Sequence, residues 1–191
     1  MTKNRLEAFS DGVLAILITI MVLELRAPHG ADWAALKALT PKLLGYTLSF
    51  VFLGIYWNNH HHMVHMATRI NGRVLWANLH LLFWLSLVPF VTAWMGENDF
   101  DSIPTALYGV VLLLSAIAYT LLLRTLIAAE GPGSGLQRAV GGDFKGVLSM
   151  ALYAAAIPLA FVRPIIAHVL YVTVALIWFV PDMRIERQLQ R

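Results

Sequence analysis

The sequence of 191 residues contains no cysteine and few charged residues. Without cysteine the chain can form no disulfide, no thiolate nucleophile and no cysteine-ligated metal site. Charged residues make up 13% of the chain and hydrophobic residues 59%, whereas soluble domains carry roughly 25% charged residues. No basic stretch is interleaved with aromatic residues, which argues against a nucleic-acid partner. The composition therefore predicts an integral membrane protein embedded in a lipid bilayer.

Long apolar runs fill most of the chain. A membrane-spanning helix needs about 20 mostly apolar residues, and six segments fit, which predicts a single all-α transmembrane domain over residues 1–191. The predicted helices cover residues of about 6–25, 41–65, 74–95, 105–128, 144–161 and 164–180. The run RPII predicts a tight hairpin between the last two, because proline can begin a helix but cannot continue one. The first segment lacks a small-residue cleavage site, so we interpret it as a retained helix.

The lysines and arginines predict which side of the membrane each loop faces. With the N-terminus in the cytoplasm, ten of the 14 basic residues lie on the cytoplasmic side and four on the other. The cytoplasmic set is Lys3, Arg5, Arg69, Arg73, Arg124, Arg138, Lys145, Arg184, Arg187 and Arg191, and the other set is Arg26, Lys37, Lys42 and Arg163. An even number of spans then places both termini in the cytoplasm. We expect the protein in the inner (plasma) membrane of the cell.

The run FSDGVLAILIT sets an aspartate against aliphatic residues. If Ser10 or Asp11 capped the helix, the remaining residues 12–25 would span only about 21 Å at 1.5 Å per residue. The hydrocarbon core is about 30 Å thick, so this helix would be too short. A start near Leu6 gives the needed length and puts Asp11 more than one turn inside the helix. Because a charge facing lipid is costly, Asp11 must face protein or water.

The helical wheel of this segment separates an apolar stripe from the polar residues. The stripe follows steps of three and four, the spacing of a surface that faces a partner helix or a symmetry axis. Its members are Phe9, Gly12, Ile16, Thr19, Leu23 and Arg26. Ser10 and Asp11 lie on either side of it at about 100° per residue. They therefore point into the subunit's own helical bundle.

A hydrogen-bonded network between helices explains these two polar residues, because polar side chains hold membrane helices together. The second and third segments offer Asn58, Asn59, His60, His61, His62, Asn78 and His80 as partners. The network that we predict consists of Arg5, Ser10, Asp11, His60, His61 and Asn78. Arg5 can be read equally well as an anchor on the cytoplasmic side or as a charged partner for this group.

The first helix also carries a motif. The run RLEAFSDGVLAI fits the pattern Arg-x-x-x-Phe-Ser-Asp-x-x-x-Ala-Ile. It resembles the signature of the transmembrane protein 175 family of potassium channels, in its short prokaryotic form. The runs YWNNHH and LWANLHLLFWLSLVPFVTAW are similar to that family's second and third helices, whereas the second half of the chain resembles the family only in hydropathy and helix count.

The resemblance implies a homotetramer of six-helix subunits whose first helices line a central pore, without a re-entrant filter loop. The family's hydrophobic constriction maps onto Ile16, Ile20 and Leu23, and a threonine ring linked to cation selectivity maps onto Thr19. The sequence lacks TVGYG or a similar filter, so a ring of carbonyl groups cannot supply selectivity. The resemblance thus implies a leak-type channel that passes potassium with a weak preference over sodium and other monovalent cations. It implies no cofactor besides the permeant ions.

Two other classes of function remain. A proton- or cation-coupled transporter could use Asp11 and the histidines as a relay, although such proteins usually show inverted repeats and broken helices. A membrane enzyme of the histidine–metal type would need histidine pairs on several helices, and only one histidine-rich region exists. His61 and His65 are spaced to share an ion, but no acidic residue follows in the segment to complete a site. We therefore predict neither an enzyme nor a metal site.

Overall fold

The computed structural model describes residues 2–131, 133–140 and 143–179. All regular secondary structure in these ranges is helical. The elements are α1 (Lys3–Ile20), the 3-10 turn η1 (Met21–Glu24), α2 (Trp33–Ala38), α3 (Thr40–Met66), α4 (Gly72–Ser86), α5 (Val88–Glu97), α6 (Ser102–Glu130), α7 (Gly135–Val140), α8 (Phe144–Val162) and α9 (Pro164–Phe179).

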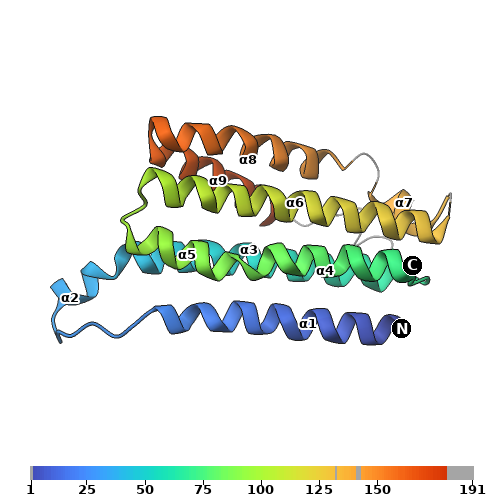
Figure 1. The fold of residues 1–191 in the computed structure, drawn as a ribbon, viewed down its shortest axis with the longest axis horizontal. Coiled ribbons are helices and arrows are strands. Elements are labelled where there is room, and N and C mark those ends of the chain that lie inside the picture. The colour runs from blue at the N-terminus through green and yellow to red at the C-terminus, as the bar shows by residue number, and fades with distance from the viewer. Residues whose placement is uncertain (1, 132, 141–142, 180–191) are drawn as a thin grey trace.

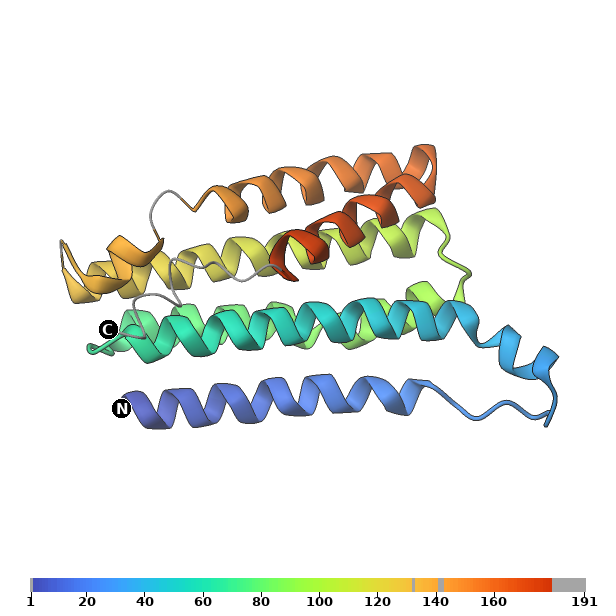
Figure 2. The same ribbon diagram turned by 180° about the vertical axis from the view of Figure 1, so that it is seen from behind.

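The long helices lie alongside one another in layers (Figures 1 and 2). α1 forms one outer edge and packs on α3, α4 and α5. α6 packs on α4 and α5 on one side and on α8 and α9 on the other. Within one chain, α1 is therefore supported from one side only.

Several helices match the thickness of a bilayer. Among the described residues, four segments are long and apolar enough to cross a membrane, namely Lys3–Glu24, Gly72–Glu97, Ser102–Glu130 and Phe144–Val162. α3 has 27 residues, about 40 Å at 1.5 Å per residue, but it carries the polar run NNHHH. α9 is an apolar helix of 16 residues. The described part of the chain is thus a bundle of helices, several of which have the length and apolar character of membrane spans.

The third predicted segment is not one continuous helix. α4 ends at Ser86 and α5 begins at Val88, with Leu87 between them. In a continuous helix, the backbone N–H group of residue 89 would donate to the carbonyl of Leu85. Pro89 has no N–H group, so this hydrogen bond cannot form. The segment expected over residues 74–95 is therefore divided into two helices at Leu87. The two helices still follow each other as one apolar segment, Gly72–Glu97.

The other bounds differ from the expected ones at the ends. The first helix, expected over residues 6–25, begins at Lys3 and tightens after Ile20 into η1, whose 3-10 geometry has about three residues per turn. The short helices α2 and α7 were not expected from the sequence. Four residues used in the predictions lie outside the described residues: Val180, the end of the sixth predicted helix, and Arg184, Arg187 and Arg191.

Candidate functional site

α1 and the η1 turn that continues it have one buried face and one exposed face. Leu6, Leu14, Leu17 and Met21 are buried and belong to the hydrophobic core. The large apolar side chains of the exposed face are Phe9 (48% exposed), Ile16 (61%), Ile20 (45%) and Leu23 (71%). Exposed apolar residues in such a contiguous stripe indicate a surface that lipid or another protein chain covers.

The residues proposed for the constriction all lie on this exposed face. Ile16 and Ile20 are one turn apart on α1, and Leu23 follows in η1. Gly12 and Thr19 are exposed on the same helix. We call residues 9, 12, 16, 19, 20 and 23 the outward stripe.

Thr19 bonds to its own helix. Its hydroxyl lies 2.8 Å from the carbonyl oxygen of Ala15 and 3.1 Å from that of Ile16. The hydroxyl proton is directed at these two acceptors, as is common for threonine within a helix. The lone pairs of the hydroxyl oxygen are therefore the part of Thr19 that is left to meet a neighbour outside the chain.

A buried chain of hydrogen bonds joins α1, α3 and α4. The Nε2 atom of His60 lies 2.7 Å from Oδ1 of Asn78, and Nδ2 of Asn78 donates to Oγ of Ser10 at 2.9 Å. Ser10 in turn donates to the backbone carbonyl of Leu6 at 2.9 Å. The side chains of His60, Asn78 and Ser10 are at most 1% exposed. These hydrogen bonds satisfy polar groups whose burial without a partner would cost free energy inside a membrane.

The amide of Asn78 fixes the direction of this chain. Because its NH₂ group donates to Ser10, its Oδ1 must accept, so His60 carries a proton on Nε2. The Nδ1 atom of His60 is buried and has no hydrogen-bond partner among the described residues.

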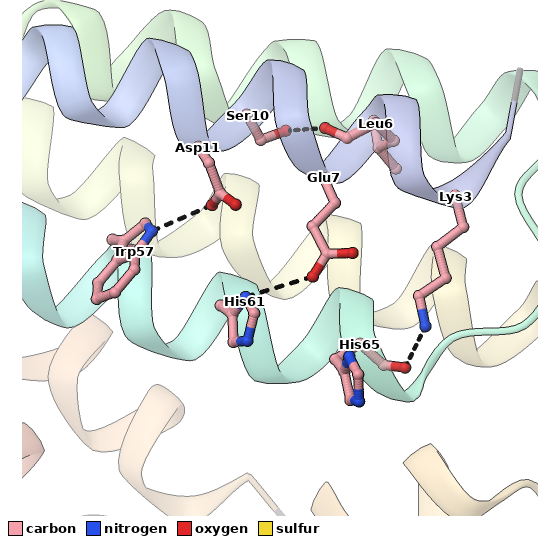
Figure 3. Close-up of polar contacts among 8 residues, drawn as sticks. All are labelled: Lys3, Leu6, Glu7, Ser10, Asp11, Trp57, His61 and His65. Atoms are coloured by element: carbon pink, nitrogen blue, oxygen red, sulfur yellow. Dashed lines mark hydrogen bonds and ion pairs between the residues drawn. The ribbon is translucent and has the colours of Figure 1, made fainter.

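Three polar contacts form a second connection between α1 and α3 (Figure 3). From the middle of α1 toward its start, the pairs are Asp11 with Trp57, Glu7 with His61, and Lys3 with the backbone carbonyl of His65. The indole N–H of Trp57 donates to Asp11 Oδ1 at 3.1 Å, and Glu7 Oε1 lies 3.3 Å from His61 Nδ1. We call these three pairs the α1–α3 ladder, because the partners advance by four residues on one helix and retreat by four on the other.

The network expected from the sequence is divided between these two groups. Ser10, His60 and Asn78 form the buried chain. Asp11 and His61 belong to the α1–α3 ladder, closer to the surface. Each group nevertheless holds α1 against the neighbouring helices.

Arg5 joins neither group. It is exposed, and no ion pair or side-chain hydrogen bond connects it to another described residue. Sequence reasoning missed Lys3, Glu7 and Trp57 as ladder members. The signal was present as polar residues repeated every four positions on both segments, but the register between two helices is set by packing.

The histidines of α3 engage in local contacts. The rings of His61 and His65 stack with their centroids 5.9 Å apart, and His61 also meets Glu7. Within the described ranges, no group of three histidine or acidic side chains is arranged to hold a metal ion.

Comparison with known proteins identifies the family. Residues 5–89 match the family model described as "Endosomal/lysosomal potassium channel TMEM175". A potassium channel of Chryseobacterium sp. (strain P1-3) is 53% identical over 190 residues, which covers 100% of this chain and 99% of that protein. The chain belongs to the TMEM175 family. The family resemblance drawn from the first helix is confirmed.

Other TMEM175 relatives extend the comparison. The crystal structure of a lysosomal potassium-selective channel TMEM175 homolog from Chamaesiphon minutus has a TM-score of 0.83 at 26% identity, covering 94% of this chain and 97% of that one. The human protein named endosomal/lysosomal proton channel TMEM175 is 30% identical over 180 residues, or 84% of this chain and 36% of that protein. The outward stripe, the buried chain and the ladder all lie within residues 5–89, except for Lys3.

Proposed function

We propose that this chain forms a potassium channel in which four copies surround a central axis and α1 of each copy lines the pore. The observation that carries the proposal is the outward stripe, in which Ile16 is 61% and Leu23 71% exposed in a single chain. A symmetry axis gives this face a partner, and Gly12 permits close approach of neighbouring helices. Relatives named as potassium channels support the choice of ion.

The apolar members of the outward stripe would form the gate. Rings of four Ile16, Ile20 and Leu23 side chains around an axis leave a narrow apolar collar, which expels water and so blocks hydrated ions. Conduction then requires the α1 helices to tilt or splay until the collar is wetted. We propose no fixed charge in this constriction.

Thr19 would set the preference among cations. Its proton is directed at carbonyl groups of its own helix, so four threonines would present oxygen lone pairs to a passing cation. These oxygens replace only part of a hydration shell. Since potassium loses water more readily than sodium, we expect a weak preference for potassium.

The buried chain does not provide a proton relay, and Asp11 is not part of it. It ends on the backbone carbonyl of Leu6, and the amide of Asn78 separates His60 from Ser10. A proton that entered at His60 would find no exit along this path. We therefore assign this row of buried hydrogen bonds a structural role, which is to fix α1 against α3 and α4.

We further propose six spans per subunit, with α3 and α9 added to the four apolar segments. α1 begins, α3 ends, α4 begins and α6 ends at the same end of the bundle (Figure 1). Lys3, Arg5, Arg69, Arg73 and Arg124 lie at or near this end of those helices, so we assign it to the cytoplasmic side of the inner membrane.

Ion flux through purified protein in liposomes tests the proposal. Wild-type protein should carry potassium down its gradient faster than sodium and much faster than a bulky cation. Ile16→Asn should raise the resting leak, because an amide ring wets the collar. Saturable uptake that requires a proton gradient would instead support the transporter.

Leu176→Asn is the matched control. Leu176 is 63% exposed, close to the 61% of Ile16, but it lies on α9. Its replacement should leave the leak at the wild-type level. An Ile16→Asn leak that equals the control would remove Ile16 from the pore.

A further inference from the structure

A groove between α4 and α6 is not used by the proposed channel mechanism. It has a volume of about 810 Å³. It is lined by Asn71, Gly72, Arg73, Trp76, Ala77, His80, Leu121 and Thr125. α4 contributes its first turns and α6 its last turns, which lie side by side (Figure 1). The groove therefore opens at the end of the bundle that we assign to the cytoplasmic side.

The charge in this groove is positive and unbalanced. No carboxylate is among the lining residues, and Arg73 has no ion-pair partner among the described residues. Glu130, the last residue of α6, is engaged elsewhere: it accepts the backbone N–H groups of Thr68 and Arg69 and the hydroxyl of Thr68. The groove thus complements an anion.

The remaining lining residues suit a lipid better than a free anion. Trp76 is 75% exposed one turn beyond Arg73, and tryptophan is typical of the level of lipid headgroups. His80 lies a further turn along and accepts the indole N–H of Trp84 on Nε2 at 2.9 Å. Because Nε2 accepts this bond, Nδ1 is the ring nitrogen that can donate. Ala77 and Leu121 add an apolar wall deeper in the membrane.

We propose that this groove binds one anionic glycerophospholipid of the cytoplasmic leaflet. Arg73 holds its phosphate, His80 and Trp76 lie along its glycerol region, and Ala77 and Leu121 contact an acyl chain. Basic pockets between membrane helices on the cytoplasmic side recognise anionic headgroups in this way. The proposal rests on the assigned membrane orientation and is independent of conduction.

Native mass spectrometry of the purified protein with added phosphatidylglycerol or phosphatidylcholine tests the site. Wild type should retain phosphatidylglycerol in preference to phosphatidylcholine. Arg73→Gln should reduce this retention about fivefold, the effect of one basic side chain near an anionic lipid. Arg138→Gln, which changes an exposed arginine of α7 outside the groove, should retain phosphatidylglycerol as wild type does.

Three results would overturn the lipid site. They are equal retention by Arg73→Gln and wild type, equal retention of the two lipids by wild type, and displacement of phosphatidylglycerol by inorganic phosphate at equal concentration. The last would mean a site for a free anion. If Arg73→Gln does not elute as folded protein, Trp76→Leu takes its place, because this variant keeps the arginine. Trp76→Leu should also retain less phosphatidylglycerol than wild type, and equal retention would overturn the lipid site. Because no flux is measured, failure here leaves the channel proposal untouched.

Discussion

Thr19 shows how much a single residue can be understood from its helix alone. A threonine inside a helix is expected to bond to a preceding carbonyl, and Thr19 does so at 2.8 Å. The sequence could not tell whether the hydroxyl also meets anything else, because that depends on what covers the outward stripe. The same holds for Asp11: its place inside α1 was predictable from helix length, whereas its partner Trp57 depended on how α3 packs.

Replacing Thr19 with alanine should lower the discrimination between potassium and sodium while conduction persists. The change removes the four oxygens that are proposed to replace part of the hydration shell, but leaves the collar intact. The reversal potential under mixed potassium and sodium measures this discrimination.

Thr173→Ala is the control for this prediction. The Thr173 hydroxyl makes the same kind of bond, to the carbonyl of Val169 at 2.7 Å, and Thr173 is partly exposed on α9. Its loss should leave the reversal potential unchanged. An unchanged potential in Thr19→Ala would exclude Thr19 from selectivity.

At the scale of elements, the helices were largely predictable and their irregularities were not. Long apolar runs predicted helices, because a membrane permits little besides helix in such runs, and among the described residues four segments are long and apolar enough to cross a membrane. The interruption at Leu87 had a visible cause in Pro89, but a proline at that place can also kink a helix without ending it. The change from α-helical to 3-10 geometry between α1 and η1 has no such cause in the sequence, because the run MVLE contains neither proline nor glycine.

The buried chain is the feature that ties elements together, so its removal should weaken the fold. Asn78→Ala leaves the Nε2–H group of His60 without its acceptor in a buried site, a loss of about 1–3 kcal/mol for an unsatisfied group. We expect the midpoint of thermal unfolding in detergent to lie several degrees below that of wild type. Intrinsic tryptophan fluorescence measures this midpoint.

Asn59→Ala provides the comparison on α3. The side chain of Asn59 donates to the carbonyl of Ile55 in its own helix and is only partly buried. Its loss should shift the transition much less. Equal shifts in the two variants would mean that the buried chain contributes no special stability between α1, α3 and α4.

At the scale of the whole molecule, contacts within one chain cover one side of α1 and leave the other side exposed. The buried side is fixed by the core, by the buried chain and by the ladder, whereas the outward stripe remains exposed. The spacing of the stripe was readable from the sequence, because the positions of a helix face follow from its periodicity. What covers the stripe was not readable, since an exposed apolar helix face can meet either lipid or another protein chain.

The most direct test of the account uses a single cysteine in the outward stripe, because the natural chain contains none. Potassium flux through Leu23→Cys protein in liposomes is measured before and after a cationic thiosulfonate reagent. Ile103→Cys, at a residue 62% exposed on α6, serves as the control. We predict that modification of Leu23→Cys abolishes most of the flux and that modification of Ile103→Cys does not change it. Unchanged flux through fully modified Leu23→Cys protein would contradict a pore lined by α1.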